Sequence, residues 1–263
     1  MNILLSTAIK AAIEAGSEIM KIYDKDFEVQ LKSDNSPLTI ADENANEIIN
    51  SFLEKTEIPI ISEENDRIDY NIRKKWKTCW MVDPLDGTKE FVKRNGEFTV
   101  NIALIQQNKP ILGVIYVPVT KELYYAVVKE NKAYKLTVNK FSLSQNILSD
   151  QQYEIQPLKS SNNQLKVVGS RSHKSIETEE FIQKLQEQGK QVEIVSKGSS
   201  LKFCLVAEGK ATIYPRFAPT MEWDTAAGHA ICNAVGLKVM QTTNSKELEY
   251  NKENLLNPYF IVS

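Results

Sequence analysis

Residues 80–88 constrain the fold more than any other stretch of the chain. Their apolar start predicts a buried strand that ends at Asp83, because Pro84 cannot donate a hydrogen bond to a neighbouring strand. Gly87 allows a positive φ and a close approach of the backbone to a ligand. From Thr88 the sequence predicts a helix whose first N–H groups point back to the same place, as in phosphate sites. The segment therefore predicts a strand, a turn and a helix around one ligand position.

Two carboxylates, Asp83 and Asp86, stand three residues apart on this turn and can converge. Carboxylate oxygens and an exposed backbone carbonyl are ligands that suit Mg²⁺. An ordinary Asp-Gly turn is the alternative, but two aspartates, a proline and a threonine after an apolar strand favour the metal site. The spacing argues against an aspartyl-phosphate mechanism of the haloacid-dehalogenase type, which uses Asp-x-Asp.

Other acidic residues stand at the ends of predicted elements. Glu63 follows an apolar run at residues 58–62, and strand ends supply cleft ligands in α/β folds. Asp224 opens a helix rich in small residues, where it also suits a helix cap. Asp42 suits the acidic end of a Thr39-x-x-Asp42 capping box, a reading compatible with a second role. Taken singly, Glu63 is more typical of a solvated acidic pair with Glu64.

The hydrophobic pattern predicts an α/β protein of two lobes. An α+β lobe at residues 1–137 is expected to contain helices 3–23 and 39–54, strands 58–62 and 79–82, and an antiparallel meander of strands 98–106, 110–117 and 123–128. Polar residues 138–164 lack periodicity and are expected to form the boundary. The α/β lobe, residues 138–263, is expected to alternate strands and helices: 165–169, 176–188, 192–195, 199–208, 211–214, 225–235, 237–240 and 259–262.

Composition narrows the function classes. The 263 residues are 42% hydrophobic and carry a net charge of −2, so the chain is globular and has no positive field for a nucleic-acid polymer. Three widely spaced cysteines predict reduced thiols in a cytoplasmic protein. We find no signal peptide and no apolar stretch of membrane-spanning length, so we expect a soluble protein. Peripheral contact with the cytoplasmic face of the inner membrane and the oligomeric state are left open.

Several motifs together resemble a known family. The stretches Ser62-Glu63-Glu64, Asp83-Pro84-Leu85-Asp86-Gly87-Thr88 and Trp223-Asp224-Thr225-Ala226-Ala227-Gly228 are similar to those of the lithium-sensitive, Mg²⁺-dependent inositol monophosphatase superfamily. Residues 83–91, 198–203 and 214–217 resemble its branch of bacterial 3'(2'),5'-bisphosphate nucleotidases. Inositol monophosphatases usually carry Thr-Asn where this chain has Lys89-Glu90. The resemblance implies a layered αβαβα sandwich.

The resemblance also implies a site that holds two or three Mg²⁺ ions. Glu63, Asp83 and the Leu85 carbonyl would bind one ion, and Asp83, Asp86 and Asp224 a second. Thr88 and Asp42 would orient and deprotonate the attacking water. Without cations, so many carboxylates would repel a phosphate ester by several kcal/mol. The residues implied to contact substrate are Glu63, Leu85, Asp86, Gly87, Thr88, Ser172, His173, Gly198, Lys202 and Asp224.

The implied reaction is hydrolysis of adenosine 3',5'-bisphosphate to AMP and phosphate by a metal-activated water, linked to sulfur assimilation. One alternative is a phosphatase for inositol monophosphate or another small phosphate monoester. A second is a catalytically silent nucleotide-binding regulator on the same scaffold. Relatives with an Arg-Ser-His-x-x-Ser pattern have serine where this chain has Ile176, so the chain departs from that pattern. We expect His229 and Cys232 to be core residues rather than metal ligands.

Overall fold

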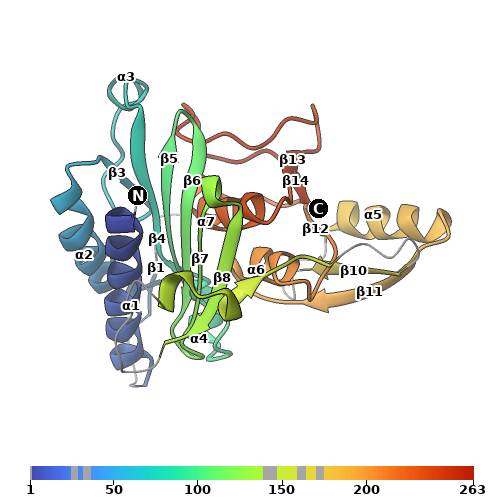
Figure 1. Ribbon diagram of the computed structural model, residues 1–263, viewed down its shortest axis with the longest axis horizontal. Helices are drawn as coiled ribbons and strands as arrows, with labels where there is room; N and C mark the ends of the chain where they lie inside the picture. Colours follow the sequence, from blue (N-terminus) through green and yellow to red (C-terminus); the bar gives the residue numbers. More distant parts are fainter. Residues whose placement is uncertain (1, 25–28, 32–36, 139–146, 159–163, 170–174) are drawn as a thin grey trace.

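A seven-stranded sheet forms the centre of the protein (Figure 1). The computed structural model describes residues 2–24, 29–31, 37–138, 147–158, 164–169 and 175–263. In spatial order the strands are β3 (Ile60–Ser62), β4 (Thr78–Asp86), β5 (Thr99–Gln106), β6 (Lys109–Val117), β7 (Glu122–Val127), β8 (Lys132–Thr137) and β9 (Glu154–Ile155). Strand β3 pairs parallel with β4, and each later pair is antiparallel. The predicted meander is therefore confirmed.

Strand β4 is longer than the sequence predicts. Pairing was expected to stop at Asp83, but Asp83 lies opposite Asn101 and Asp86 lies opposite Thr99, with a register shift between them. Pro84 falls inside this irregular stretch, where a residue without an N–H donor is tolerated. The expected strand end is wrong because the irregularity accommodates the proline. Both aspartates stay attached to β5.

Two helices cover one face of this sheet, α1 (Asn2–Tyr23) and α2 (Ile40–Leu53) (Figure 1). Their buried apolar side chains follow the predicted helical spacing, as with Ile9 and Ile19 in α1 and Ile49 in α2. A small antiparallel pair, β1 (Val29–Leu31) and β2 (Pro37–Thr39), connects the two helices. The side chain of Thr39 is outside the described residues, so the capping box stays a prediction.

The opposite face of the sheet is covered by α6 (Leu201–Ala207) and α7 (Glu222–Ala234). Helix α7 begins three residues before the predicted start at 225, because the Asp224 carboxylate accepts a hydrogen bond from Met221 N at 2.9 Å and caps the first turn. The core position expected for His229 and Cys232 is confirmed, since both are buried. Burial lowers the pKa of His229 to about 4, so the ring is neutral near pH 7.

A second set of strands lies beyond α6 and α7 (Figure 1). Strands β10 (Gln164–Gly169) and β11 (Gln191–Ser196) are parallel, and β12 (Tyr214–Arg216), β14 (Phe260–Val262) and β13 (Val239–Gln241) are antiparallel in that order. A bridge between Val167 and Ile213 links the two groups. Helix α5 (Ile176–Glu187) lies against β11. The layers alternate as α1/α2, sheet, α6/α7, strands and α5, which is the expected αβαβα order.

The two-lobe division at residue 138 stays a prediction. Strand β9 follows that position in the sequence but pairs with β8 in the central sheet. The short helices α3 (Tyr70–Arg73) and α4 (Thr88–Val92) both follow predicted site residues. Among the described residues, no helix has the length and apolar character needed to cross a membrane.

Candidate active site

Three carboxylates from distant parts of the chain meet at one point. Glu63 follows the end of β3, Asp83 lies in β4, and Asp224 lies in the first turn of α7. One carboxylate oxygen from each lies within 4.8 Å of those of the other two. The parallel pairing of β3 with β4 places Glu63 beside Asp83, and Glu63 N donates to Val82 O at 3.2 Å. The packing of α7 on the sheet supplies the third carboxylate.

The carboxylates of this cluster disfavour one another's charged forms. Burial, followed by the charges of Glu63, Asp86, Asp224 and Asp42, raises the pKa of Asp83 well above its ordinary value. Burial and then the charges of Asp86 and Glu63 raise the pKa of Asp224 in the same direction. A divalent cation would reverse this penalty, and oxygen donors at this separation suit a hard cation such as Mg²⁺. The residues present therefore fit the metal that the family resemblance implies.

Asp86 lies on the other side of Asp83 and is held by neighbouring polar groups. Its Oδ2 accepts hydrogen bonds from Ser200 N at 2.5 Å and from Asn101 Nδ2 at 3.4 Å. Burial raises its pKa, while the Lys202 ammonium and these hydrogen bonds lower it. The charge of Asp86 acts on both Asp83 and Asp224, so it borders the cluster. Its role as a ligand of a second ion stays a prediction.

Lys202 is a buried cation beside Asp86. Burial lowers the pKa of Lys202 to about 8, and the neighbouring Asp86 carboxylate opposes that effect. Its Nζ donates to Ser199 O at 2.5 Å and lies 5.8 Å from the centre of the Tyr214 ring. Lys202 lines a pocket of about 140 Å³ together with Asp86, Gly87, Lys89, Gly198, Arg216, Asp224 and others.

The predicted turn after Asp83 has the expected backbone. Gly87 adopts φ +95°, and α4 begins at Thr88. Leu85 N donates to Asp83 Oδ1 at 3.1 Å, and Thr88 Oγ1 donates to Leu85 O at 3.5 Å. Asp42, which is 2% exposed on α2, lies close enough to contribute to the raised pKa of Asp83. The pairing of Thr88 with Asp42 to activate water remains a prediction.

Two implied substrate residues, Ser172 and His173, lie outside the described residues. Gly198 is in the pocket, but its N–H donates to Glu97 Oε2 at 2.9 Å, and a side chain there would approach Glu90 Cγ to 2.8 Å. The backbone of Gly198 is thus used to attach the start of α6 to the segment before β5.

Sequence reasoning missed several residues that complete this region. Ser200 and Asn101 hold Asp86, and their side chains are joined at 2.7 Å. Arg216 lines the pocket of Lys202, and its buried Nε has no hydrogen-bond partner among the described residues. Ser200 and Arg216 lie in stretches that resemble the nucleotidase branch, but the resemblance does not single them out, and Asn101 has no local signal because its partners are far away in the sequence.

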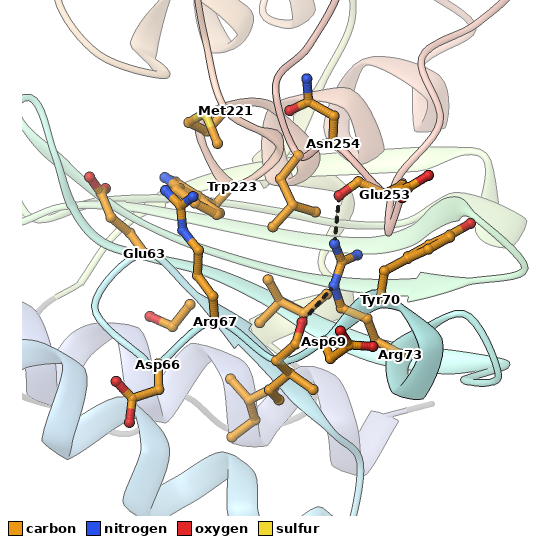
Figure 2. A pocket seen from close by; sticks show the side chains of 15 residues that line it. Glu63, Asp66, Arg67, Asp69, Tyr70, Arg73, Met221, Trp223, Glu253 and Asn254 are labelled. Carbon is orange, nitrogen blue, oxygen red and sulfur yellow. Dashed lines mark hydrogen bonds between the residues drawn. The ribbon is translucent and has the colours of Figure 1, made fainter.

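A larger pocket of about 300 Å³ borders the cluster on the Glu63 side. Figure 2 shows Glu63 at one side of this pocket and Arg73 at the other, and Trp223 also lines it. Its walls come from β3, the segment that leads to α3, the start of α7 and residues 253–255. The two pockets thus flank the acidic cluster.

The motifs and geometry agree with a comparison against family models, in which residues 2–259 match the description "Inositol monophosphatase family". The chain belongs to this family. Its relatives include proteins named 3'(2'),5'-bisphosphate nucleotidase CysQ. Those of Salmonella typhimurium (strain LT2) and Escherichia coli (strain K12) are 47% and 46% identical, and each match covers 99% of both chains. The resemblance stated from the motifs is confirmed, and enzymes of this family are metal-dependent.

Solved structures of the family have the same fold. The crystal structure of CysQ from Bacteroides thetaiotaomicron, described as a bacterial member of the inositol monophosphatase family, is 52% identical with a TM-score of 0.88, covering 98% of this chain and 96% of that one. The Thermotoga maritima IMPase is 21% identical with a TM-score of 0.76, covering 100% and 92%. The second likeness shows the fold alone.

Proposed function

We propose that this protein is a Mg²⁺-dependent phosphomonoesterase that converts adenosine 3',5'-bisphosphate and water to AMP and phosphate. The observation that carries the proposal is the close set of Glu63, Asp83 and Asp224 next to a pocket lined by the buried Lys202 and by Arg216. The printed names of relatives at 46–47% identity support the choice of substrate. A site with two or three ions is part of the proposal.

The carboxylates Glu63, Asp83 and Asp224, with the Leu85 carbonyl and Asp86, would hold the cations. When bound, Mg²⁺ supplies Lewis-acid stabilisation of the phosphoryl oxygens and makes water a stronger nucleophile. Thr88 and Asp42 would position the attacking water and take its proton. The water oxygen forms the new bond to phosphorus, the bond from phosphorus to the ribose oxygen breaks, and that oxygen leaves with a proton.

The pocket of Lys202 supports a substrate with a second phosphate. Lys202 and Arg216 bring two cationic groups to a small pocket that also contains the Tyr214 ring. The buried Nε of Arg216 has no hydrogen-bond partner among the described residues, so this guanidinium keeps an unused donor. A guanidinium and an ammonium match a phosphate in charge and hydrogen bonding. The hydroxyls of an inositol ring are neutral and need no cationic partner.

An assay of phosphate and AMP formation tests the proposal. Purified protein with Mg²⁺ is expected to hydrolyse adenosine 3',5'-bisphosphate faster than inositol monophosphate, and to leave 5'-AMP intact. Preference for inositol monophosphate would replace the substrate assignment. Binding of the nucleotide without phosphate release at any Mg²⁺ concentration would favour the silent regulator instead.

We also infer a cytoplasmic location. Cys79, Cys204 and Cys232 are free and buried, as is usual where thiols are kept reduced. A soluble enzyme with a small nucleotide substrate fits this compartment.

A further inference from the structure

The segment formed by residues 251–253 lies between the two elements that deliver Glu63 and Asp224. On one side it contacts Arg73, which is 5% exposed and ends α3. Arg73 Nη1 donates to Asn251 Oδ1 at 2.9 Å and to Lys252 O at 2.6 Å, and Nη2 donates to Glu253 O at 2.9 Å. Asn251 Nδ2 donates back to Arg73 O at 2.8 Å. Figure 2 shows the contact between Arg73 and Glu253 at the side of the larger pocket.

Arg73 also fixes the loop that begins at Glu63. Its Nε donates to Ile68 O at 3.2 Å, so the guanidinium joins residues 64–72 to the C-terminal segment. Five donors in one rigid plane make arginine suited to such multiple carbonyl contacts. The position of this loop therefore depends on segment 251–253.

On its other side the segment contacts Glu222, which is fully buried and stands two residues before Asp224. The Glu222 carboxylate accepts hydrogen bonds from Asn251 N at 2.5 Å, Lys252 N at 3.1 Å and Lys252 Nζ at 2.5 Å. Glu222 N donates to Leu255 O at 2.9 Å. The first turn of α7 is thus attached to the same segment as the Glu63 loop.

We infer that Arg73 and Glu222 are positioning residues that set the separation of Glu63 and Asp224 through segment 251–253. The inference rests on the proposed metal centre. Glu63 and Asp224 repel each other in the absence of a cation, so their close approach needs an external constraint. Asp224 also caps Met221 N in the turn that Glu222 anchors, so a shift of that turn moves its carboxylate directly.

The polar character of this connection fits positioning better than general stabilisation. Buried ion pairs often contribute no more to stability than apolar residues of the same volume, and in some proteins they select one geometry. Groups that orient metal ligands typically change metal affinity about 10–100-fold when removed. Segment 251–253 would orient two ligands at once.

Calorimetric titration of the metal-free protein with Mg²⁺ tests the inference without an activity measurement. Glu222→Gln keeps the shape of the side chain but removes its charge, and Arg73→Lys removes the planar set of donors. Each is expected to weaken Mg²⁺ binding about 10–100-fold while the circular dichroism spectrum is unchanged. Lys252→Arg, which keeps the cation beside Glu222, should bind nearly as tightly as the unaltered protein.

The matched control is Lys238→Met, which breaks the exposed pair of Lys238 with Glu247 at 2.6 Å in the same C-terminal part of the chain. It should leave Mg²⁺ affinity unchanged. If Glu222→Gln fails to fold, Lys252→Met serves instead, because the two backbone donors to Glu222 remain. A variant that lowers the unfolding temperature but binds Mg²⁺ as the unaltered protein does would overturn the positioning role alone. An unaltered protein that binds no Mg²⁺ would overturn the metal centre as well.

Discussion

At the scale of single residues, Asp83 connects most of the groups in the site. It is 1% exposed and its charge interacts with four other carboxylates, led by Glu63. In the metal-free protein this arrangement is unfavourable, since a buried carboxylate loses hydration and meets charges of the same sign. The benefit of Asp83 therefore depends on a bound cation.

Replacing Asp83 by Asn separates these two effects. The amide removes one ligand charge, so we expect Mg²⁺-dependent hydrolysis to fall by about 100-fold or more. The same change removes repulsion, so the metal-free variant should unfold at the same or a higher temperature. Phosphate release and thermal unfolding measure the two effects. Asp66→Asn, in the neighbouring pocket, is the control and should retain activity.

The raised pKa of Asp83 also predicts a pH dependence. A carboxyl whose pKa is higher in the folded than in the unfolded state binds more protons when folded, so its contribution to stability falls as pH rises above its ordinary value of about 3.9. The prediction concerns the unfolding temperature of metal-free Asp83→Asn minus that of the metal-free unaltered protein. This difference should increase as the pH rises from about 4 to neutrality. A difference that does not vary with pH would contradict this assignment.

At the scale of elements, α7 must lie close to β6 to deliver Asp224. Gly113 in β6 permits this approach, because a Cβ there would lie 2.4 Å from Ala227 O and 2.8 Å from Ala230 Cβ. Buried apolar side chains of both elements, such as Ile115 of β6 and Ile231 of α7, belong to one core cluster. The position of the third carboxylate thus depends on a glycine outside the site.

The Gly113→Ala variant should displace α7 from the sheet. Crowding of this kind costs about 1–3 kcal/mol of the free energy of unfolding, which urea denaturation measures. Gly169→Ala is the control, because its Cβ would make only an ordinary contact at 3.6 Å with Ile194. Equal stability of the two variants would show that α7 is not seated by Gly113.

The sequence predicts those parts of this arrangement that depend on local patterns. Helical spacing predicts α1 and α2, because that pattern reports the burial of one face, and short apolar runs between turns predict the meander, whose strands are buried on both faces. The extent of β4 was wrong, since a register shift around Pro84 depends on the partner strand. Residues 251–253 have no periodicity, and their importance comes from contacts with Arg73 and Glu222.

The same distinction holds within the candidate site. Glu63, Asp83 and Asp224 stand beside turn and helix signals that can be recognised in the sequence. Asn101 does not, and although Ser200 stands at the start of a predicted helix, its contact with Asp86 needs a partner that only the folded chain brings near.

At the scale of the whole molecule, the acidic cluster joins the layers of the sandwich. Glu63 and Asp83 come from the central sheet, and Asp224 comes from the helical layer that covers it. A cation shared by the three would tie these layers together in the folded state only. Binding should therefore stabilise the protein as a whole.

Addition of Mg²⁺ to metal-free protein should raise the unfolding temperature. At a concentration about 100 times the dissociation constant the gain is about 2.7 kcal/mol, or about 5–11 °C for a chain of this size. A chelator should reverse the shift, and Asp83→Asn should not show it. An equal shift in Asp83→Asn would place the stabilising cation elsewhere.

The most direct measurement is anomalous diffraction from crystals soaked in Mn²⁺, which replaces Mg²⁺ at oxygen-ligand sites. We predict an anomalous peak in contact with carboxylate oxygens of Glu63, Asp83 and Asp224, at metal–oxygen distances near the ~2.0–2.1 Å of Mg²⁺ sites. Carboxylates that lie together with no peak between them, or a peak bound by other residues, would contradict the metal centre on which the proposed hydrolysis depends.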